Sequence, residues 1–174
     1  LTMGMYGNMD FYDMKGIVEH LMNVLGMTDV AEYLPEKELS WMHPGRTASV
    51  VVNGDKVGYL GELHPAVAKN YGIGTRAYLA VMDMEKLTQY ANRSVVYKAL
   101  PKFPAITRDI AMLVKEDVTV KEIADIIKAN GGEYLEEVKL FDVYQGAQIE
   151  AGCKSVAYSI AFRSVEKTLS DTDI

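Results

Sequence analysis

Apolar residues recur at helical spacing near the start of the sequence, between Asp10 and Gly26. One face of the predicted helix carries Met14, Ile17, Val18, Leu21, Val24 and Leu25. Asp10 is a favourable residue to precede the first turn of a helix, and Gly26 is a favourable stop. The sequence therefore predicts a helix over residues 10–25.

The residues after this helix predict a series of short strands and helices. The predicted strands lie at 48–52, 57–63 and 77–82, and the predicted short helices lie at 65–71 and 84–90. The dipeptide Asn53-Gly54 favours a tight turn between antiparallel strands. The apolar residues within 28–46 follow neither the helical nor the strand period, so we expect this segment to be irregular. The pattern predicts a mostly antiparallel sheet with the helix 10–25 packed on it.

Residues 88–104 have the pattern of a linker. Polar residues give way to Leu100-Pro101-Lys102-Phe103-Pro104, and two prolines in this stretch disfavour a regular helix or strand. We place a domain boundary near residue 95, which gives two modules, 1–94 and 95–174.

The second module has a simple order of elements. They are a strand at 108–114, a helix from 119 to Gly131-Gly132, strands at 138–144 and 155–163, and a helix start at Ser170. Thr119 and Glu122 have the spacing of a capping box, which marks the start of the first helix. This order is typical of a ferredoxin-like βαββαβ unit that lacks its last helix and strand. The fold class is therefore α+β.

The strand at 155–163 alternates large and small side chains. The large set is Val156, Tyr158, Ile160 and Phe162, and the small set is Ser155, Ala157, Ser159 and Ala161. The large set should face the helices, which leaves the small set on the other face of the sheet. That face has room either for a flat ligand or for a neighbouring domain.

Composition narrows the class of protein. The net charge is −6, and each module contributes −3, which excludes a protein that holds DNA or RNA by bulk electrostatics. The single cysteine, Cys153, excludes an internal disulfide and fits a reducing cytoplasm. There is no apolar run of about 18 residues, so no membrane span is predicted.

Several short motifs occur in a characteristic order. They are Asp10-Phe11-Tyr12-Asp13-Met14-Lys15-Gly16, His43-Pro44-Gly45-Arg46, Gly58-Tyr59-Leu60-Gly61-Glu62-Leu63-His64-Pro65, Pro101-Lys102-Phe103-Pro104, Thr107-Arg108-Asp109, Leu140-Phe141-Asp142-Val143-Tyr144-Gln145-Gly146, Lys154-Ser155 and Lys167-Thr168-Leu169-Ser170-Asp171. Together, along nearly the whole chain, they resemble the C-terminal part of the β subunit of bacterial-type phenylalanyl-tRNA synthetase.

The resemblance implies a role for each module. Residues 1–94 would be part of a class II synthetase-like module without catalytic residues, which packs against the α subunit of an α2β2 assembly. Residues 95–174 would be a ferredoxin-fold anticodon-binding domain for tRNA(Phe). The whole ligase would use ATP and Mg²⁺ in the cytoplasm, whereas these two modules would hold no cofactor and perform no catalysis.

Three residues are candidates for anticodon contact. If Phe141 and Val143 face the core, Asp142 and Tyr144 share the other face of the sheet, and Ser155 lies on that face of the next strand. A carboxylate can accept from the donors of a guanine edge, and an aromatic ring can stack on an unpaired base. In the resembled family these strands contact the anticodon. Without the resemblance, turn and edge hydrogen bonds would be the favoured role for Asp142 and Tyr144.

Two alternative functions would depend on other features of the sequence. A metal hydrolase would need His43, His64 and Glu62, but their spacing matches no common zinc motif, and a structural role for both histidines is favoured. We interpret Arg46 as an ion-pair or interface residue. A ferredoxin-like regulatory module that binds a small molecule is the second alternative. A glycine-rich loop after the first strand of the ferredoxin-like unit would support this alternative. This sequence has Lys115-Glu116-Asp117 at that place instead.

Overall fold

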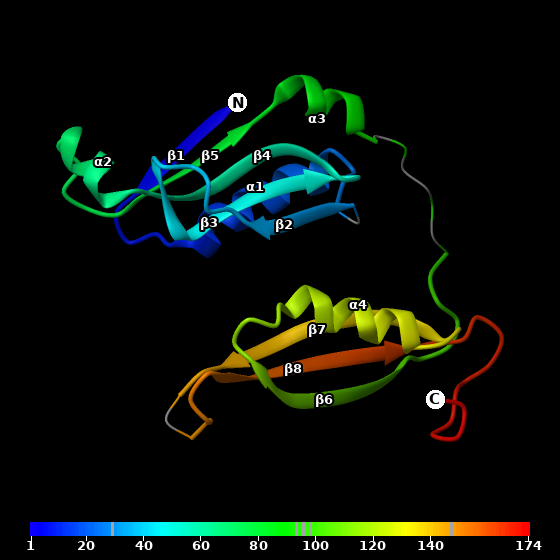
Figure 1. Cartoon of the computed structure of the whole chain (residues 1–174). Coiled ribbons are helices and arrows are strands. Elements are labelled where there is room, and N and C mark those ends of the chain that lie inside the picture. The colour runs from blue at the N-terminus through cyan, green and yellow to red at the C-terminus, as the bar shows by residue number, and fades with distance from the viewer. Residues whose placement is uncertain (29, 93, 95–96, 98, 147) are drawn as a thin grey trace. The chain divides into compact units, whose positions relative to one another are not determined.

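The computed structural model contains two compact units, Leu1–Val96 and Tyr97–Ile174 (Figure 1). It describes residues 1–28, 30–92, 94, 97, 99–146 and 148–174. The expected domain boundary at residue 95 lies outside the described residues. None of the helices in the described part is long and apolar enough to cross a lipid bilayer.

The first unit is built on a five-stranded antiparallel sheet with the order β1-β5-β4-β3-β2. Its strands are β1 (Thr2–Tyr6), β2 (Ala31–Pro35), β3 (Met42–Val52), β4 (Asp55–Leu63) and β5 (Ala77–Met82). Asn53 and Gly54 connect β3 to β4 with positive φ angles of 51° and 86°. These are the backbone angles that the predicted turn requires.

Helix α1 (Phe11–Val24) supplies the core of this unit. Its buried residues Met14, Val18 and Met22 pack with sheet residues such as Val50 and Leu60. Asp10 caps the helix, as predicted, by accepting from two backbone N–H groups of the first turn. The shorter helices α2 (Pro65–Asn70) and α3 (Met84–Tyr90) follow β4 and β5. The predicted antiparallel sheet with one packed helix is confirmed.

The expectation of an irregular segment at 28–46 is wrong. It contains β2 and the first residues of β3, and β1 is a further strand that the pattern did not reveal. β2 is an edge strand of five residues that ends in Pro35, too short to show a clear period. In β3 the pairing is irregular between Met42 and Thr47, where Pro44 and Gly45 resemble a turn in the sequence.

The second unit has the predicted order of elements. They are β6 (Ile106–Lys115), α4 (Val120–Asn130), β7 (Leu135–Tyr144) and β8 (Cys153–Phe162). The sheet order is β6-β8-β7, with both pairs antiparallel, so the last strand lies in the centre. The capping box of Thr119 and Glu122 forms as predicted. The α+β fold with a ferredoxin-like unit is confirmed.

The core of the second unit lies between α4 and one face of β8. Ile123 of α4 packs with Val156, Tyr158 and Ile160. The Tyr158 hydroxyl donates to the backbone oxygen of Val120, and burial raises the pKa of this phenol. The large residues of β8 therefore face the helix, as their alternation predicts.

The helix expected to start at Ser170 is not formed. Asp173 accepts from the backbone N–H of Ser170, which is one half of a capping box, but residues 171 and 172 form only a turn. The Asp173 amide donates to the Ser170 oxygen, a bond that closes this turn. The sequence signal thus marks a local hydrogen bond rather than a helix in these residues.

Two substitutions on the same sheet test the assigned faces. Ile160→Ala should destabilise the second unit by about 2–5 kcal/mol, because a large buried side chain is lost from its core. Leu113→Ala, on a side chain that is 68% exposed, should change stability by less than about 0.5 kcal/mol. Hydrogen–deuterium exchange of the α4 amides measures the change in stability in each variant. Equal changes in the two variants would contradict the assignment of Ile160 to the buried face and Leu113 to the exposed face.

Candidate nucleic-acid interface

The face of the β6-β8-β7 sheet that lies opposite α4 forms a continuous surface, here called the open face. Cross-strand partners in a sheet share a face, so the register defines its members. They are Thr107, Asp109, Ala111, Leu113 and Lys115 of β6, Cys153, Ser155, Ala157, Ser159 and Ala161 of β8, and Glu137, Lys139, Asp142 and Tyr144 of β7. Two of its rows are Leu113–Ser155–Tyr144 and Ala111–Ala157–Asp142.

A β-bulge in β7 determines which side chains reach the open face. Leu140 pairs with Tyr158 on the α4 face, whereas Asp142 pairs with Ala157 on the open face, and Phe141 is the extra residue between them. In a regular strand, Leu140 and Asp142 would point the same way. The bulge changes the parity of the strand, so Asp142 and Tyr144 lie opposite small residues of β8.

The structure brings the three candidate residues together. Tyr144 pairs directly with Ser155, and Asp142 lies one row further along the sheet. Tyr144 is 44% exposed and Asp142 is exposed, whereas Ser155 is partly covered. Within the described part of the chain, no side chain forms a hydrogen bond with any of the three. An acceptor, an aromatic ring and a hydroxyl are thus available to a ligand on one surface.

The assumption that Phe141 and Val143 are core residues is wrong. Phe141 is 55% exposed because it occupies the bulge, and Val143 is also exposed although it pairs with the buried Val156. Alternation alone could not reveal the bulge. The pattern of apolar residues changes from even positions (Val138, Leu140) to odd ones (Val143), and that break in parity was the available signal.

Gly146 ends the motif that begins at Leu140, but the sequence assigned it no role beside the open face. A Cβ atom at this position would lie 2.3 Å from the Tyr144 hydroxyl and 2.6 Å from the adjacent ring carbon. Such contacts are far shorter than a van der Waals separation. The backbone of Gly146 therefore lies against the phenol, and the absence of a side chain allows Tyr144 to keep its position.

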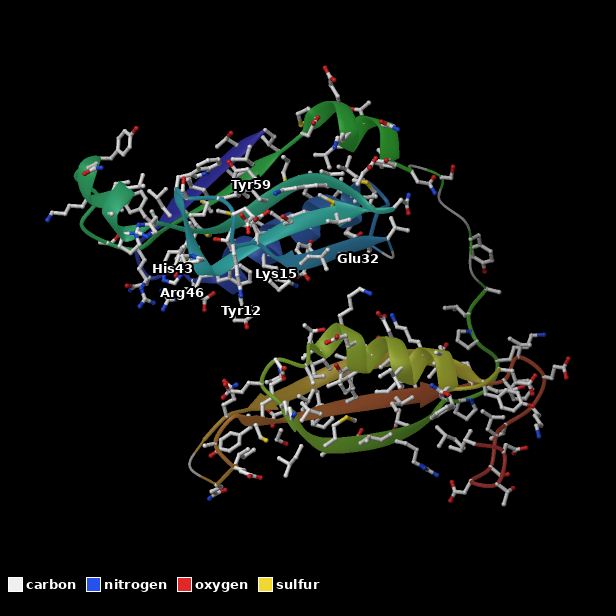
Figure 2. All side chains as sticks on the ribbon, viewed as in Figure 1. Tyr12, Lys15, Glu32, His43, Arg46 and Tyr59 are labelled. Carbon is white, nitrogen blue, oxygen red and sulfur yellow. The ribbon has the colours of Figure 1, made fainter. Side chains whose placement is uncertain are left out.

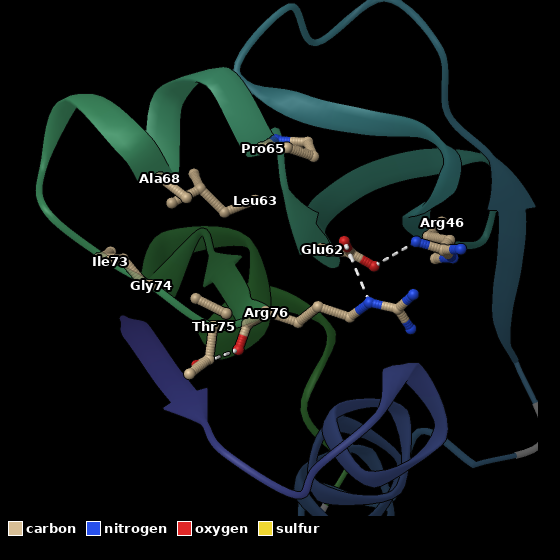
Figure 3. A pocket seen from close by; sticks show the side chains of 10 residues that line it. Arg46, Glu62, Leu63, Pro65, Ala68, Ile73, Gly74, Thr75 and Arg76 are labelled. Atoms are coloured by element: carbon tan, nitrogen blue, oxygen red, sulfur yellow. Dashed lines mark hydrogen bonds and ion pairs between the residues drawn. The ribbon is translucent and has the colours of Figure 1, made fainter.

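A second polar cluster lies in the first unit, beside a cavity of about 350 Å³ (Figure 3). Glu62 is only 3% exposed, and its carboxylate accepts from Arg46 Nη1 at 2.8 Å. Arg76 Nε lies 3.9 Å from the other oxygen. Arg46 is thus an ion-pair residue, as predicted. The Glu62 carboxylate thus forms ion pairs with two guanidinium groups.

The two histidines considered for a metal site have local structural roles. His43 Nδ1 accepts from the Gly45 amide at 3.1 Å, next to Arg46 on β3 (Figure 2). His64 Nδ1 accepts from the Ala66 amide at 3.2 Å and so caps α2. The described residues include no group of three His, Cys, Asp or Glu side chains that could hold a metal ion.

Two family models match this chain, one for each unit. Residues 101–174 match the ferredoxin-fold anticodon binding domain, and residues 2–84 match the phenylalanyl tRNA synthetase beta chain CLM domain. The chain belongs to the phenylalanine–tRNA ligase β-subunit family.

Similar curated proteins support this assignment over the whole sequence. The phenylalanine–tRNA ligase beta subunit of Clostridium acetobutylicum is 47% identical over 174 residues, which is 100% of this chain and 22% of that protein. The same subunit of Clostridium tetani is 48% identical over the same shares. That of Shouchella clausii is 40% identical over 94% of this chain and 20% of its own length. The chain therefore spans about a fifth of the length of these relatives.

The contact between Gly146 and Tyr144 can be tested directly. Gly146→Ala should displace the Tyr144 ring, because the new methyl group would overlap the phenol. Aromatic NMR shifts of Tyr144, with a crystal structure of the variant, measure the displacement. Gly16→Ala is the control, since a Cβ there meets nothing within 4 Å, and it should leave those signals unchanged. If the Tyr144 ring keeps its position in Gly146→Ala, the backbone at residue 146 has moved instead.

Proposed function

We propose that the open face binds the anticodon of tRNA(Phe), within a ligase that attaches phenylalanine to this tRNA at the expense of ATP. The observation that carries the proposal is the bulge at Phe141, which places Asp142 and Tyr144 beside Ser155 on one accessible surface. That surface lies in the segment that matches an anticodon-binding family. In this proposal residues 95–174 are the anticodon-binding domain.

The chemistry of the three side chains suits the first anticodon base. Anticodons that read phenylalanine codons begin with guanine, whose Watson–Crick edge presents N–H donors. Asp142 supplies the acceptor for these donors, and Tyr144 supplies a stacking plane for the unpaired base. Ser155, opposite Tyr144, supplies a hydroxyl that can donate or accept.

The charge of the chain restricts how the RNA is held. The net charge is −6, so these residues alone do not attract a polyanion over a long distance. The contact must then be short-range and geometric, with other parts of the assembly supplying positive charge to the tRNA backbone. The absence of attraction by bulk charge increases the importance of each base contact for specificity.

The first unit has a scaffolding role in this proposal. Residues 1–94 would be a non-catalytic class II synthetase-like module that packs against an α subunit in an α2β2 enzyme of the cytoplasm. Helix α1 exposes Ile17 and Val24, which lie seven residues apart on one flank of the helix. Exposed aliphatic residues at this spacing suit a protein partner. ATP and Mg²⁺ would be bound by the α subunit.

Asp142 and Tyr144 should contribute differently to tRNA recognition. Asp142→Asn should weaken discrimination for guanine at the first anticodon position by about 1–3 kcal/mol, because the amide adds donors opposite the donors of the base. Tyr144→Ala should cost about 1–3 kcal/mol with less dependence on the base, since any base can stack. Aminoacylation of wild-type tRNA and of tRNA changed at that position measures both effects.

The matched control is Asp125→Asn, an exposed carboxylate on α4, on the other side of the sheet from the open face. It should charge both tRNAs at wild-type rates. Amino-acid activation without tRNA should be unchanged in all variants. The anticodon assignment is wrong if Asp142→Asn lowers activation itself or leaves discrimination intact.

The scaffolding role predicts that α1 is sensitive to charge on its exposed flank. Val24→Asp in the full β subunit should reduce recovery of the α subunit in co-purification, because the carboxylate would have to be desolvated at the contact. The neighbouring Asn23→Asp, also exposed, adds the same charge one position away and is the control. Equal recovery with both variants would place the partner elsewhere on the unit.

A further inference from the structure

We propose that β6 forms a third side of the anticodon site, where Leu113 packs against the bound base and Lys115 binds an adjacent phosphate. The inference rests on the proposed function. Asp142, Tyr144 and Ser155 all lie on β7 and β8, whereas Leu113 and Lys115 lie on the strand across β8 from them.

The register sets Leu113 opposite Tyr144. Leu113 pairs with Ser155, and Ser155 pairs with Tyr144, so the three residues form one row across the sheet. Neighbouring strands are about 4.8 Å apart, so the outer two residues of a row are separated by about 10 Å. Stacked bases are about 3.4 Å apart. After both side chains take their space, the slot above Ser155 has room for one base.

Leu113 is unusual among the residues of the open face. It is 68% exposed, and it is the one large aliphatic side chain among the open-face residues of β6. The apolar partners that β6 gives to the α4 core, Met112 and Val114, lie on the other face. Leu113 thus contributes nothing to that core. In the slot it would cover the side of the base that Tyr144 does not cover.

The charged side chains along the open face would orient the bound nucleotide. Beyond the row of Leu113, the next open-face residue of β6 is Lys115, whose ammonium group has no hydrogen bond or ion pair within the described residues. In the opposite direction lie three carboxylates, Asp142, Asp109 and Glu137, and one ammonium group, that of Lys139, so this end still carries an excess of negative charge. A phosphate is attracted to the Lys115 end and repelled from the acidic end. The base then points inward from Lys115, with its edge toward Asp142.

The experiment uses the full β subunit assembled with its α partner. Leu113→Ala should raise the KM for tRNA about tenfold, whatever the first anticodon base, because apolar contact does not read the edge of the base. Lys115→Gln should reduce the salt dependence of tRNA binding by about 0.7 in the slope of log K against log salt, the loss of one phosphate contact. ATP–pyrophosphate exchange should be unchanged in both.

Matched controls lie on α4, away from the open face. Ile126→Ala removes an aliphatic side chain that is 64% exposed, and Lys128→Gln removes an exposed lysine near the end of the same helix. Both should retain wild-type tRNA kinetics and salt dependence. A double variant of Leu113→Ala and Tyr144→Ala should lose less than the product of the two single losses, because both side chains contact one base.

The outcomes separate this inference from the function on which it rests. If Tyr144→Ala impairs charging but Leu113→Ala and Lys115→Gln match their α4 controls, β6 has no part in the site. If the loss in the double variant equals the product of the losses in Leu113→Ala and Tyr144→Ala, the two side chains do not contact the same base. If Tyr144→Ala and Asp142→Asn have no effect either, the anticodon assignment itself fails. A decrease in pyrophosphate exchange with Leu113→Ala would indicate a structural role instead.

Discussion

The second unit depends on one strand, β8, which pairs on both of its edges and must serve two faces at once. Its large residues Val156, Tyr158 and Ile160 bury against α4, and this contact forms the core of the unit. The small residues between them form the floor of the open face. A larger residue in the floor would fill the space next to Tyr144, and a smaller one in the core would leave a cavity. The strand therefore couples the stability of the unit to the shape of its candidate binding surface.

Much of this arrangement could be predicted from the sequence because it is encoded locally. The helix at α1, the turn at Asn53-Gly54 and the capping box at Thr119 each depend on a few adjacent residues. The large and small alternation of β8 is also local. Placing Asp142, Tyr144 and Ser155 on one face followed from such patterns, and the register agrees with that placement.

The features that could not be predicted depend on pairing between distant segments. β1 and β2 are short edge strands with few β-branched residues, and their partners in the sheet determine their conformation. The bulge at Phe141 arises from the register with β8 rather than from β7 alone. In each case the deciding contact is tertiary, which a local pattern does not record.

The bulge also affects how β7 can change length during evolution. Loss of a residue from the regular part of this strand would turn every side chain on one side of the deletion to the opposite face. Phe141 is different, because it is the extra residue of the bulge. If it were deleted, Leu140 and Asp142 would become neighbours in a regular alternation, and both would keep their present faces. Homologous strands that are one residue shorter can therefore preserve the same surface when the gap falls at this position, and the register shift between Leu135 and Glu137 offers a second such place.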